Sequence, residues 1–307
     1  DRKRTMDFDA ALVRALQEDG RASVQSLADR LQQSRAAVSA RLRSMLADGS
    51  VRVIAAVDPA LLGQHVLAHV SIRTSGGAEP VAQRLRDLDE TVLVSAVGGG
   101  SDLVVEVRVR STERLYDLLT DIRRFSGVID ISTLVYTSVV KGFFVSDYRG
   151  ELRIDDIDLA LIELLQRDGR MSYRALGDTV RLSPSAVTSR VQRLIDGGVV
   201  KISAVEARGL THRQLSMGIG LNLTSDDDAV IDALRGWRGV DFAARTLGRF
   251  DAIATLVEPT TRALFESVER IRALPGVTRL ESWVHLAVLK EDYARTLRPT
   301  SADGWGA

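Results

Sequence analysis

Apolar residues recur at every fourth position in two stretches of the chain, and this spacing predicts an amphipathic helix in each stretch. The positions are Phe8, Leu12 and Leu16 in the first stretch, and Ile157, Leu161 and Leu165 in the second. Farther along, from Val66 and again from Leu215, the spacing changes to every second position, which is typical of strands with one buried face. The same order of helices and strands is therefore predicted twice.

The sequence repeats itself with an offset of 149 residues. Residues 9–51 match residues 158–200 at 17 of 43 positions, and the later halves stay in phase without a net insertion. A repeat of this length indicates that one structural unit occurs twice in the chain. The polar stretch from about residue 145 to residue 156 is the predicted joint between the two copies.

In each copy, roughly the first 50 residues predict three short helices followed by a strand. A Gly-Arg pair ends the first helix at Gly20 and at Gly169, and a serine stands where each later helix begins. A serine at such a position caps free N–H groups of the first helical turn. The capping serines are Ser23, Ser34, Ser172 and Ser183. This order is typical of a winged helix-turn-helix, whose third helix enters the major groove of DNA.

The remaining residues of each copy predict the order β-α-β-β-α-β, a ferredoxin-like layer of two helices on an antiparallel sheet. One face of each sheet carries partly apolar residues and no helix, so we expect it to pack against another sheet. The predicted fold class is α+β, with two winged helix-turn-helix domains and two ferredoxin-like effector-binding domains in tandem. The predicted boundaries are residues 1–58 and 151–207 for the DNA-binding domains, and 62–144 and 212–295 for the ferredoxin-like domains.

The third predicted helix of each copy has a polar outer stripe opposite an apolar one, which in the first copy is Val38, Leu42 and Met45. Outward Arg, Gln, Ser and Thr side chains reach base edges, since Arg pairs with guanine and Gln with adenine. The candidate DNA-binding residues are Arg35, Ala36, Ser39, Arg41 and Arg43 in the first copy, and Pro184, Ser185, Thr188, Arg190 and Gln192 in the second. Arg41 and Arg190 lie at the border between the stripes, where they either hold a phosphate or brace the fold.

Charge and composition narrow the classes of function. Lys plus Arg and Asp plus Glu both number 41, so DNA affinity has to come from local clusters such as residues 30–52, with five arginines and one aspartate. Cysteine is absent, which excludes disulfides, thiolate catalysis and zinc sites that use sulfur. No apolar run reaches the roughly 18 residues that span a bilayer, and the first residues lack the apolar segment of a signal peptide. We expect a soluble, cytoplasmic protein with no membrane partner.

The first module carries a specific pattern of residues. It reads D-x-x-L-x-x-x-L-Q-x-D-G-R-x-S-x-x-x-L, then S-x-x-x-V-x-x-R, then a helix ended by glycine and a strand, and it spans Asp9 to Val51 and again Asp158 to Val200. This pattern resembles the Lrp/AsnC family of bacterial and archaeal transcription regulators. The resemblance implies that each copy joins a DNA-binding domain to a β-α-β-β-α-β effector domain, and that the chain is a tandem fusion of two family units.

The resemblance also implies an effector site near a hairpin with the sequence G-x-[aromatic]-D. The second copy has this sequence at residues 248–251, whereas the first copy keeps the glycine and the aspartate at residues 99–102 and lacks the aromatic residue. The candidate effector-binding residues are Gly99, Ser101, Asp102, Gly248, Phe250 and Asp251. An aspartate that only shapes the turn is an equally good interpretation of this hairpin.

The function predicted from these features is that of a sequence-specific regulator that binds double-stranded DNA and responds to a small metabolite such as an amino acid. The resemblance implies a dimer of family units, and if one chain supplies both halves of that dimer, its two reading helices can diverge. Unlike half-sites are the hypothesis that follows. Sheet edges and faces left over in the effector core lead us to expect a homo-oligomer. An architectural, DNA-compacting protein is the first alternative.

A tetrapyrrole enzyme is the second alternative, because siroheme decarboxylases resemble the same family. Their hairpin region carries histidine and tyrosine, and the matching stretches from Thr91 and from Val240 contain neither, so we expect no catalytic residues, no cofactor and no enzymatic activity. His65 and His69 lie four residues apart on a predicted strand and so share a face, but no third ligand is near them in the sequence. We expect packing and polar edge positions for these histidines and no metal site.

Overall fold

The computed structural model describes residues 2–142, 152–206 and 215–292. Two compact units are present, and each is assembled from both copies of the repeat. One contains the described residues up to Leu62 and residues 152–206, and the other contains residues 63–142 and 215–292. Residues 145–151 of the predicted joint and the predicted domain boundaries at residues 1, 144, 151, 207, 212 and 295 lie outside the described residues.

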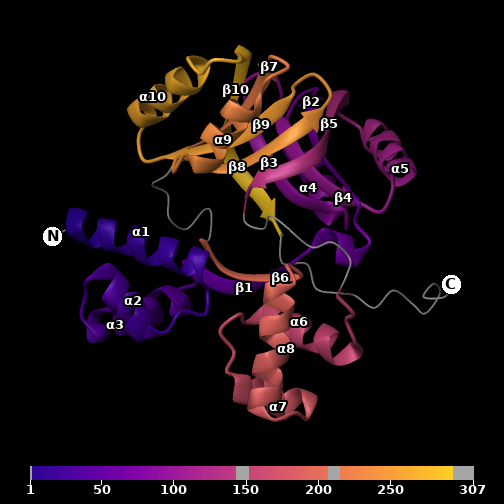
Figure 1. The fold of residues 1–307 in the computed structure, drawn as a ribbon. Coiled ribbons are helices and arrows are strands. Elements are labelled where there is room, and N and C mark those ends of the chain that lie inside the picture. Colours follow the sequence, from indigo (N-terminus) through magenta and orange to yellow (C-terminus); the bar gives the residue numbers. More distant parts are fainter. Residues whose placement is uncertain (1, 143–151, 207–214, 293–307) are drawn as a thin grey trace. The chain divides into compact units, whose positions relative to one another are not determined.

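The first unit contains both three-helix modules, with the helices where the hydrophobic spacing predicts them (Figure 1). In the first copy these are α1 (Arg2–Glu18), α2 (Val24–Leu31) and α3 (Arg35–Ala47), and in the second α6 (Asp156–Arg167), α7 (Tyr173–Val180) and α8 (Pro184–Asp196). The four predicted capping serines are confirmed, since each hydroxyl accepts a hydrogen bond from the backbone N–H three residues later.

The strand after each third helix pairs with its counterpart from the other copy. β1 (Val51–Val57) and β6 (Val200–Glu206) form an antiparallel two-stranded sheet, and a short 3-10 helix, η1 (Pro59–Leu62), follows β1. Helix α1 packs against β6 and helix α6 packs against β1, so each first helix contacts the strand of the other copy. The buried residues of both modules consequently form one hydrophobic core.

The second unit is a closed barrel of eight strands with two helices of each copy packed on its outside (Figure 1). The first copy supplies β2 (Val66–Thr74), α4 (Glu79–Asp87), β3 (Thr91–Gly98), β4 (Leu103–Val109), α5 (Thr112–Arg123) and β5 (Val128–Lys141). The second supplies β7 (Leu215–Leu223), α9 (Asp228–Gly236), β8 (Val240–Leu247), β9 (Ala252–Glu258), α10 (Thr261–Arg272) and β10 (Val277–Glu291). Both follow the predicted β-α-β-β-α-β order.

The barrel closes because the last strand of each copy is shared between the two sheets. The strand order is β10-β3-β4-β2-β5-β8-β9-β7, and β10 also pairs with β7. The first half of β5 pairs with β2 of its own copy, and from Val135 onward β5 pairs with β8 of the other copy. Strand β10 does the same with β7 and then with β3, changing partner at Val284. The predicted packing of sheet against sheet is thus accompanied by a continuous hydrogen-bonded ladder.

A lysine near the end of each shared strand binds the C-terminal end of a helix of the other copy. The Lys290 ammonium donates to the backbone carbonyls of Arg86 and Leu88, both at 2.9 Å, at the C-terminal end of α4. The Lys141 ammonium donates to the carbonyl of Trp237 at 2.5 Å, at the corresponding end of α9. Carbonyls at the end of a helix lack intrahelical partners, so a cation placed there stabilises the helix of the other copy. Within the described ranges, no helix has both the length and the apolar character needed to cross a membrane.

Candidate DNA-binding and effector-binding sites

The predicted reading face of α3 points to solvent. Arg35, Ala36 and Arg43 are exposed and Ser39 is half-buried. The opposite, apolar stripe is buried in the shared core, as predicted, and comprises Val38, Leu42 and Met45. The Arg43 Nε donates a weak hydrogen bond to the carbonyl of Ser39 at 3.3 Å, one turn earlier in the same helix. The arrangement presents cations at the positions that face a groove in helix-turn-helix proteins.

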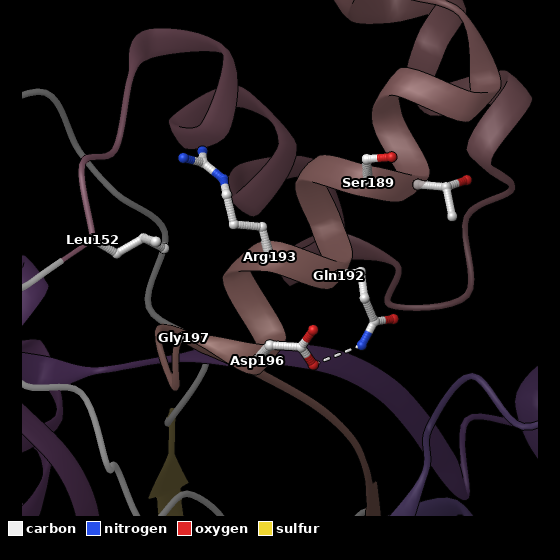
Figure 2. A pocket seen from close by; sticks show the side chains of 7 residues that line it. Leu152, Ser189, Gln192, Arg193, Asp196 and Gly197 are labelled. Atoms are coloured by element: carbon white, nitrogen blue, oxygen red, sulfur yellow. Dashed lines mark hydrogen bonds between the residues drawn. The ribbon is translucent and has the colours of Figure 1, made fainter.

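Helix α8 presents a different set of side chains at the matching positions. Pro184, Ser185, Thr188 and Gln192 are all exposed. An open hollow of about 670 Å³ runs along this helix, and Figure 2 shows the side chains around it. Its lining residues are Leu152, Thr188, Ser189, Gln192, Arg193, Asp196 and Gly197.

Polar side chains of α8 are held by contacts along the helix itself. The Thr188 hydroxyl donates to the carbonyl of Pro184 at 2.8 Å, and the Gln192 amide donates to the Asp196 carboxylate at 2.8 Å. The predicted reading face of the second module therefore carries the neutral Thr188 and Gln192 next to the Asp196 carboxylate, whereas that of the first module carries the cations Arg35 and Arg43.

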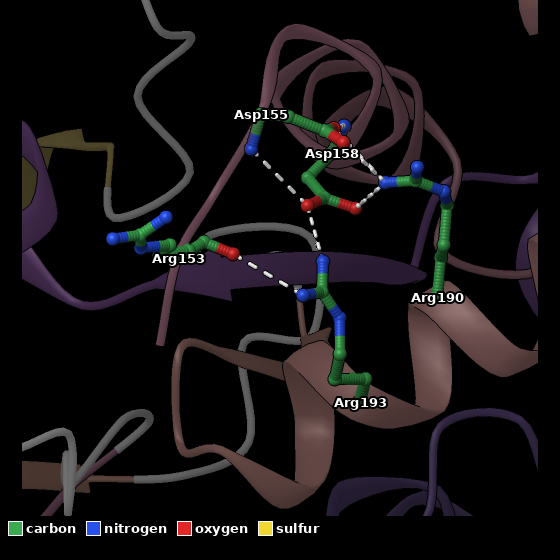
Figure 3. Close-up of polar contacts among 5 residues, drawn as sticks. All are labelled: Arg153, Asp155, Asp158, Arg190 and Arg193. Carbon is green, nitrogen blue, oxygen red and sulfur yellow. Dashed lines mark hydrogen bonds and ion pairs between the residues drawn. The ribbon is translucent and has the colours of Figure 1, made fainter. Parts of the chain in front are cut away.

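Arg41 and Arg190 point away from the reading faces and into ion pairs. Arg41 binds Asp9 through two hydrogen bonds of 2.6 Å, and this contact raises the pKa of the arginine. Arg190 binds Asp155 and Asp158 at 2.8 Å, while Arg193 binds the other oxygen of Asp158 (Figure 3). Asp158 is completely buried, and its carboxylate also accepts from the N–H of Asp155.

These contacts bear on the two roles left open for Arg41 and Arg190. Each connects the third helix of its module to the first helix or its N-cap, and its charge is balanced by carboxylates, so the geometry favours a brace over a phosphate contact. Arg193 was not among the predicted site residues, since the matching residue of the first copy is Ser44 and the repeat gives no signal for an arginine there.

The predicted effector hairpins connect β3 to β4 and β8 to β9. The Asp102 carboxylate accepts from the backbone N–H of Thr74 at 2.7 Å, and the Asp251 carboxylate accepts from that of Leu223 at 2.8 Å. Both aspartates thus attach the hairpin to the end of a neighbouring strand, which agrees with the turn-shaping interpretation. Ser101 is half-buried.

The glycines of the two hairpins lie against the shared strand of the other copy. Gly99 has a φ of 139° and packs on Trp283, and Gly248 has a φ of 145°. A Cβ on Gly248 would come within 2.6 Å of the Leu134 side chain, so both space and backbone conformation require glycine. Phe250 is 3% exposed and belongs to a small core with Leu134. The hairpins are therefore contacts between the copies.

The space between the two sheets contains His69 and His285, which were not predicted to lie there. His69 is buried, with its ring 5.4 Å from that of Trp283, and His285 Nδ1 lies 2.8 Å from the Ser95 hydroxyl. Burial lowers the pKa of His69 to about 3, with smaller contributions from the charges of His285 and Arg249.

The expectation that His65 and His69 share a strand face is wrong. β2 begins at Val66, so His65 precedes the ladder and is exposed, while His69 points into the barrel. Among the described residues, no three His, Asp or Glu side chains are grouped so that they could hold a metal ion.

Comparisons with known proteins match both modules twice. A model of the AsnC-type helix-turn-helix domain matches residues 7–46 and 154–195, and a model of the Lrp/AsnC ligand binding domain matches residues 66–143 and 217–295. The chain belongs to the Lrp/AsnC family. Among relatives in the family, the HTH-type transcriptional regulator LrpA of Mycobacterium tuberculosis is 35% identical over 132 residues, covering 42% of this chain and 88% of LrpA. LysM of Sulfurisphaera tokodaii is 23% identical over 135 residues, covering 44% of this chain and 96% of LysM.

A solved structure shares the duplicated architecture over nearly the whole chain. The siroheme decarboxylase NirDL has a TM-score of 0.63 and 17% identity, covering 93% of this chain and 92% of that protein. Its complex with an iron-uroporphyrin III analogue has the same TM-score at 15% identity, covering 95% of each chain. At this identity the likeness concerns the fold alone.

The buried state of His69 makes the stability of the protein dependent on pH. In the unfolded chain His69 takes up a proton below about pH 6.5, whereas in the folded protein it stays neutral down to about pH 3. The free energy of unfolding therefore falls as the pH falls through this window. We expect a loss of about 2 kcal/mol at pH 5 relative to pH 8, removed in His69→Gln. Urea titrations at each pH measure it, with exposed His65→Gln as the control. Parallel profiles for His69→Gln and the wild type would contradict this placement.

The ion pair of Arg41 predicts an effect on stability without an effect on phosphate binding. Arg41→Met leaves Asp9 without its bidentate partner, and because both side chains are partly exposed we expect a loss of about 1–2 kcal/mol in unfolding free energy. The slope of log affinity for DNA against log salt should stay that of the wild type. Arg43→Met, which removes an exposed arginine of the same helix, is the matched control and should leave stability unchanged. A slope lowered by about one unit in Arg41→Met would show that Arg41 contacts a phosphate.

Proposed function

We propose that the protein is a sequence-specific regulator of transcription whose reading heads are α3 and α8. The observation that carries this proposal is the segregation of arginines on the first head. Arg35 and Arg43 stay exposed on the outer stripe, whereas Arg41 is neutralised by Asp9 beneath it. Exposed arginines on a recognition helix supply bidentate contacts to guanine and to phosphate. The protein would then act in the cytoplasm, where bacterial and archaeal DNA lies.

The two heads are proposed to read unlike half-sites. Positions that correspond under the 149-residue offset carry Arg43 and Gln192, which prefer guanine and adenine respectively. The other corresponding pairs are Arg35 with Pro184, and Ser39 with Thr188. The acidic Asp196 beside Gln192 further weakens attraction of phosphate at the second head, so we expect the first head to contribute most of the electrostatic affinity.

A small metabolite is the proposed effector, taken up by the ligand-binding barrel near the hairpins at residues 99–102 and 248–251. In each hairpin one carboxylate oxygen accepts from backbone, and an ammonium group of an amino acid is a suitable partner for the same carboxylate. Closure of the barrel pairs the sheet edges from which self-association was expected, so that basis for a homo-oligomer is wrong. Self-association through the outer helices is proposed instead, and Tyr116 on α5 and Phe265 on α10 support it. These aromatic side chains occupy corresponding positions and are 67% and 64% exposed.

A tetrapyrrole enzyme is the second candidate, and the whole-chain likeness to NirDL together with the imidazoles of His69 and His285 inside the barrel favours it. Titration with iron-uroporphyrin III, followed by absorbance, separates the two candidates. A shifted Soret band with stoichiometric binding would support the enzyme, and an unchanged spectrum of the added compound would support the regulator.

Selection of binding sites from random double-stranded DNA, followed by footprinting, tests the proposed function directly. A recurring asymmetric sequence with two protected segments is the expected result. A palindromic sequence would overturn the assignment of unlike heads, and protection without any preferred sequence would favour DNA compaction.

Arg43 should carry specificity for the first half-site. If its guanidinium contacts a base, Arg43→Ala weakens binding to the selected operator by roughly 1–3 kcal/mol and relaxes the preference at one base pair. Exposed Arg14→Ala, on a helix outside the reading face, controls for loss of charge. Measurement is by fluorescence anisotropy at fixed salt, and an operator affinity equal to that of the wild type would remove Arg43 from the reading surface.

An amino-acid effector should raise thermal stability in a way that depends on the hairpin carboxylates. At a concentration 100 times its dissociation constant, an effector stabilises the folded protein by about 2.7 kcal/mol. Differential scanning fluorimetry across the standard amino acids should therefore identify one compound or a related group. Asp251→Asn, which keeps the oxygen that accepts from Leu223, should reduce the shift, and Asp102→Asn reports on the other hairpin. If both variants showed the same thermal shift as the wild type, the carboxylates would be excluded from the effector site.

A further inference from the structure

The triplet Asp-Gly-Arg at the end of the first helix occurs in both copies, and its arginines reach across to the opposite copy. Arg21 donates to the carbonyls of Gly169 and Met171 at 2.6 and 2.9 Å. Arg170 donates to the carbonyls of Gly20 and Ala22 at 2.6 and 3.0 Å. Each guanidinium therefore hydrogen-bonds to the loop that carries the other arginine. We call these four hydrogen bonds the reciprocal arginine clamp.

The other two residues of the triplet serve the same clamp. Gly20 donates its N–H to the carbonyl of Ile202, and Gly169 donates to that of Val53, so each loop also touches the β1–β6 sheet. A Cβ on Gly20 would come within 2.7 Å of the Ile202 oxygen, which leaves room only for glycine. The aspartates accept from the N–H of their own arginine, at 2.9 Å for Asp19 and 2.8 Å for Asp168, and so shape the loop.

The partners of the clamp are suited to fixing the relative position of the two loops more than to supplying electrostatic stabilisation. Both guanidiniums hydrogen-bond to neutral carbonyls, and burial together with the neighbouring Arg21 lowers the pKa of Arg170. The two cations repel each other and their partners are neutral, so the clamp provides less electrostatic stabilisation than two ion pairs would. The planar fork of arginine matches two carbonyls that lie two residues apart, which a lysine ammonium cannot do. Arg21 also stacks on Tyr173, with 4.3 Å between the guanidinium carbon and the ring centre.

Apart from the clamp, the two modules are joined mainly by their common hydrophobic core, whose attraction is non-directional, and by the two-stranded ribbon of β1 and β6. Ribbons of two strands twist easily, because no third strand fixes their angle. The clamp adds a second line of hydrogen bonds on the loops that follow α1 and α6, away from the β1–β6 ladder. Rotation of one module about the ribbon would break the contacts of both arginines.

We propose that Arg21 and Arg170 are positioning residues that hold the two reading heads at one separation and orientation, so that the protein selects operators by the spacing of their half-sites. This inference rests on the proposed DNA-binding function. Half-sites on duplex DNA face the same side only at whole helical turns, and a change of about 5 bp turns one of them to the opposite side. Rigidly held heads cannot follow such a change, whereas hinged heads can.

The test compares operators that differ only in spacing. We expect the wild type to bind the selected operator at least about tenfold more tightly than a copy lengthened by about 5 bp. Arg21→Lys/Arg170→Lys keeps both charges but loses the fork, and its preference should fall below about threefold. Arg14→Lys/Arg174→Lys changes one exposed arginine in each copy and should keep the preference of the wild type.

A measurement without DNA separates this inference from the proposed function. Because the chain has no cysteine, Asp29→Cys and Asp178→Cys, at corresponding exposed positions of α2 and α7, place one spin label on each module. Double electron–electron resonance should give a narrow distance distribution that broadens in the lysine double variant.

The outcomes are distinct. Failure of the wild type to bind any duplex would reject the proposed function, while the distance distribution would still test the clamp. An unchanged distribution, or a spacing preference that survives in a folded double variant, would overturn the inference. Should the double variant fail to fold, the single variants Arg21→Lys and Arg170→Lys are each expected to show about half of the loss of preference on a logarithmic scale, and full preference in both would overturn it.

Discussion

Each unit of this protein depends on the exchange of elements between the two copies of the repeat. In the first unit β1 and β6 pair with each other and each first helix packs on the strand of the other copy. In the second, β5 and β10 change partners at Val135 and Val284 and complete a barrel. An exposed sheet edge is a site of unwanted pairing, and mutual exchange removes the edges from both sheets at once. Neither copy could close its sheet alone.

Fusion of two family units into one chain allows the two sides of this exchange to differ. Trp283 lies over Gly218, where a Cβ would come within 2.1 Å of the indole. The corresponding positions of the first copy hold Leu134 and His69, so a large and a very small residue on one side are matched by two residues of intermediate size on the other. A symmetric dimer would have to use the same pair twice. Compensation of volume within each pair keeps the core filled while the residues diverge.

The two helix-turn-helix modules also differ in the ion pairs that connect their third helix to their first. The second head buries Asp158 beneath Arg190 and Arg193, whereas the first uses the single pair of Arg41 with Asp9. The ion pairs that connect α3 and α8 to the first helices of their modules thus differ in composition, as do the charges of the two outer stripes. The hairpins at residues 99–102 and 248–251 lie against the shared strands, so the proposed effector, bound near them, would act on the contact between the copies.

The local elements of this protein follow from its sequence alone. Hydrophobic spacing, capping serines and the repeat predict the helices and strands with small errors at their ends, because these signals depend on neighbours a few residues away. The outward face of α3 was predictable for the same reason, since burial of Val38, Leu42 and Met45 determines which side chains point out.

Tertiary structure alone decided which partner each strand, arginine and histidine finds. The sequence shows that Arg41 lies at a border, but only the packing of α1 brings Asp9 to it. In the same way, the sequence predicts His69 to be a packing or polar edge residue, and only the position of β10 brings Trp283 against it. The arginines of the two Asp-Gly-Arg triplets are predicted only to end a helix, and their contacts form where the two copies meet. Contacts between residues about 150 positions apart leave no trace in local periodicity, because loop closure and core packing, and not local propensity, select them.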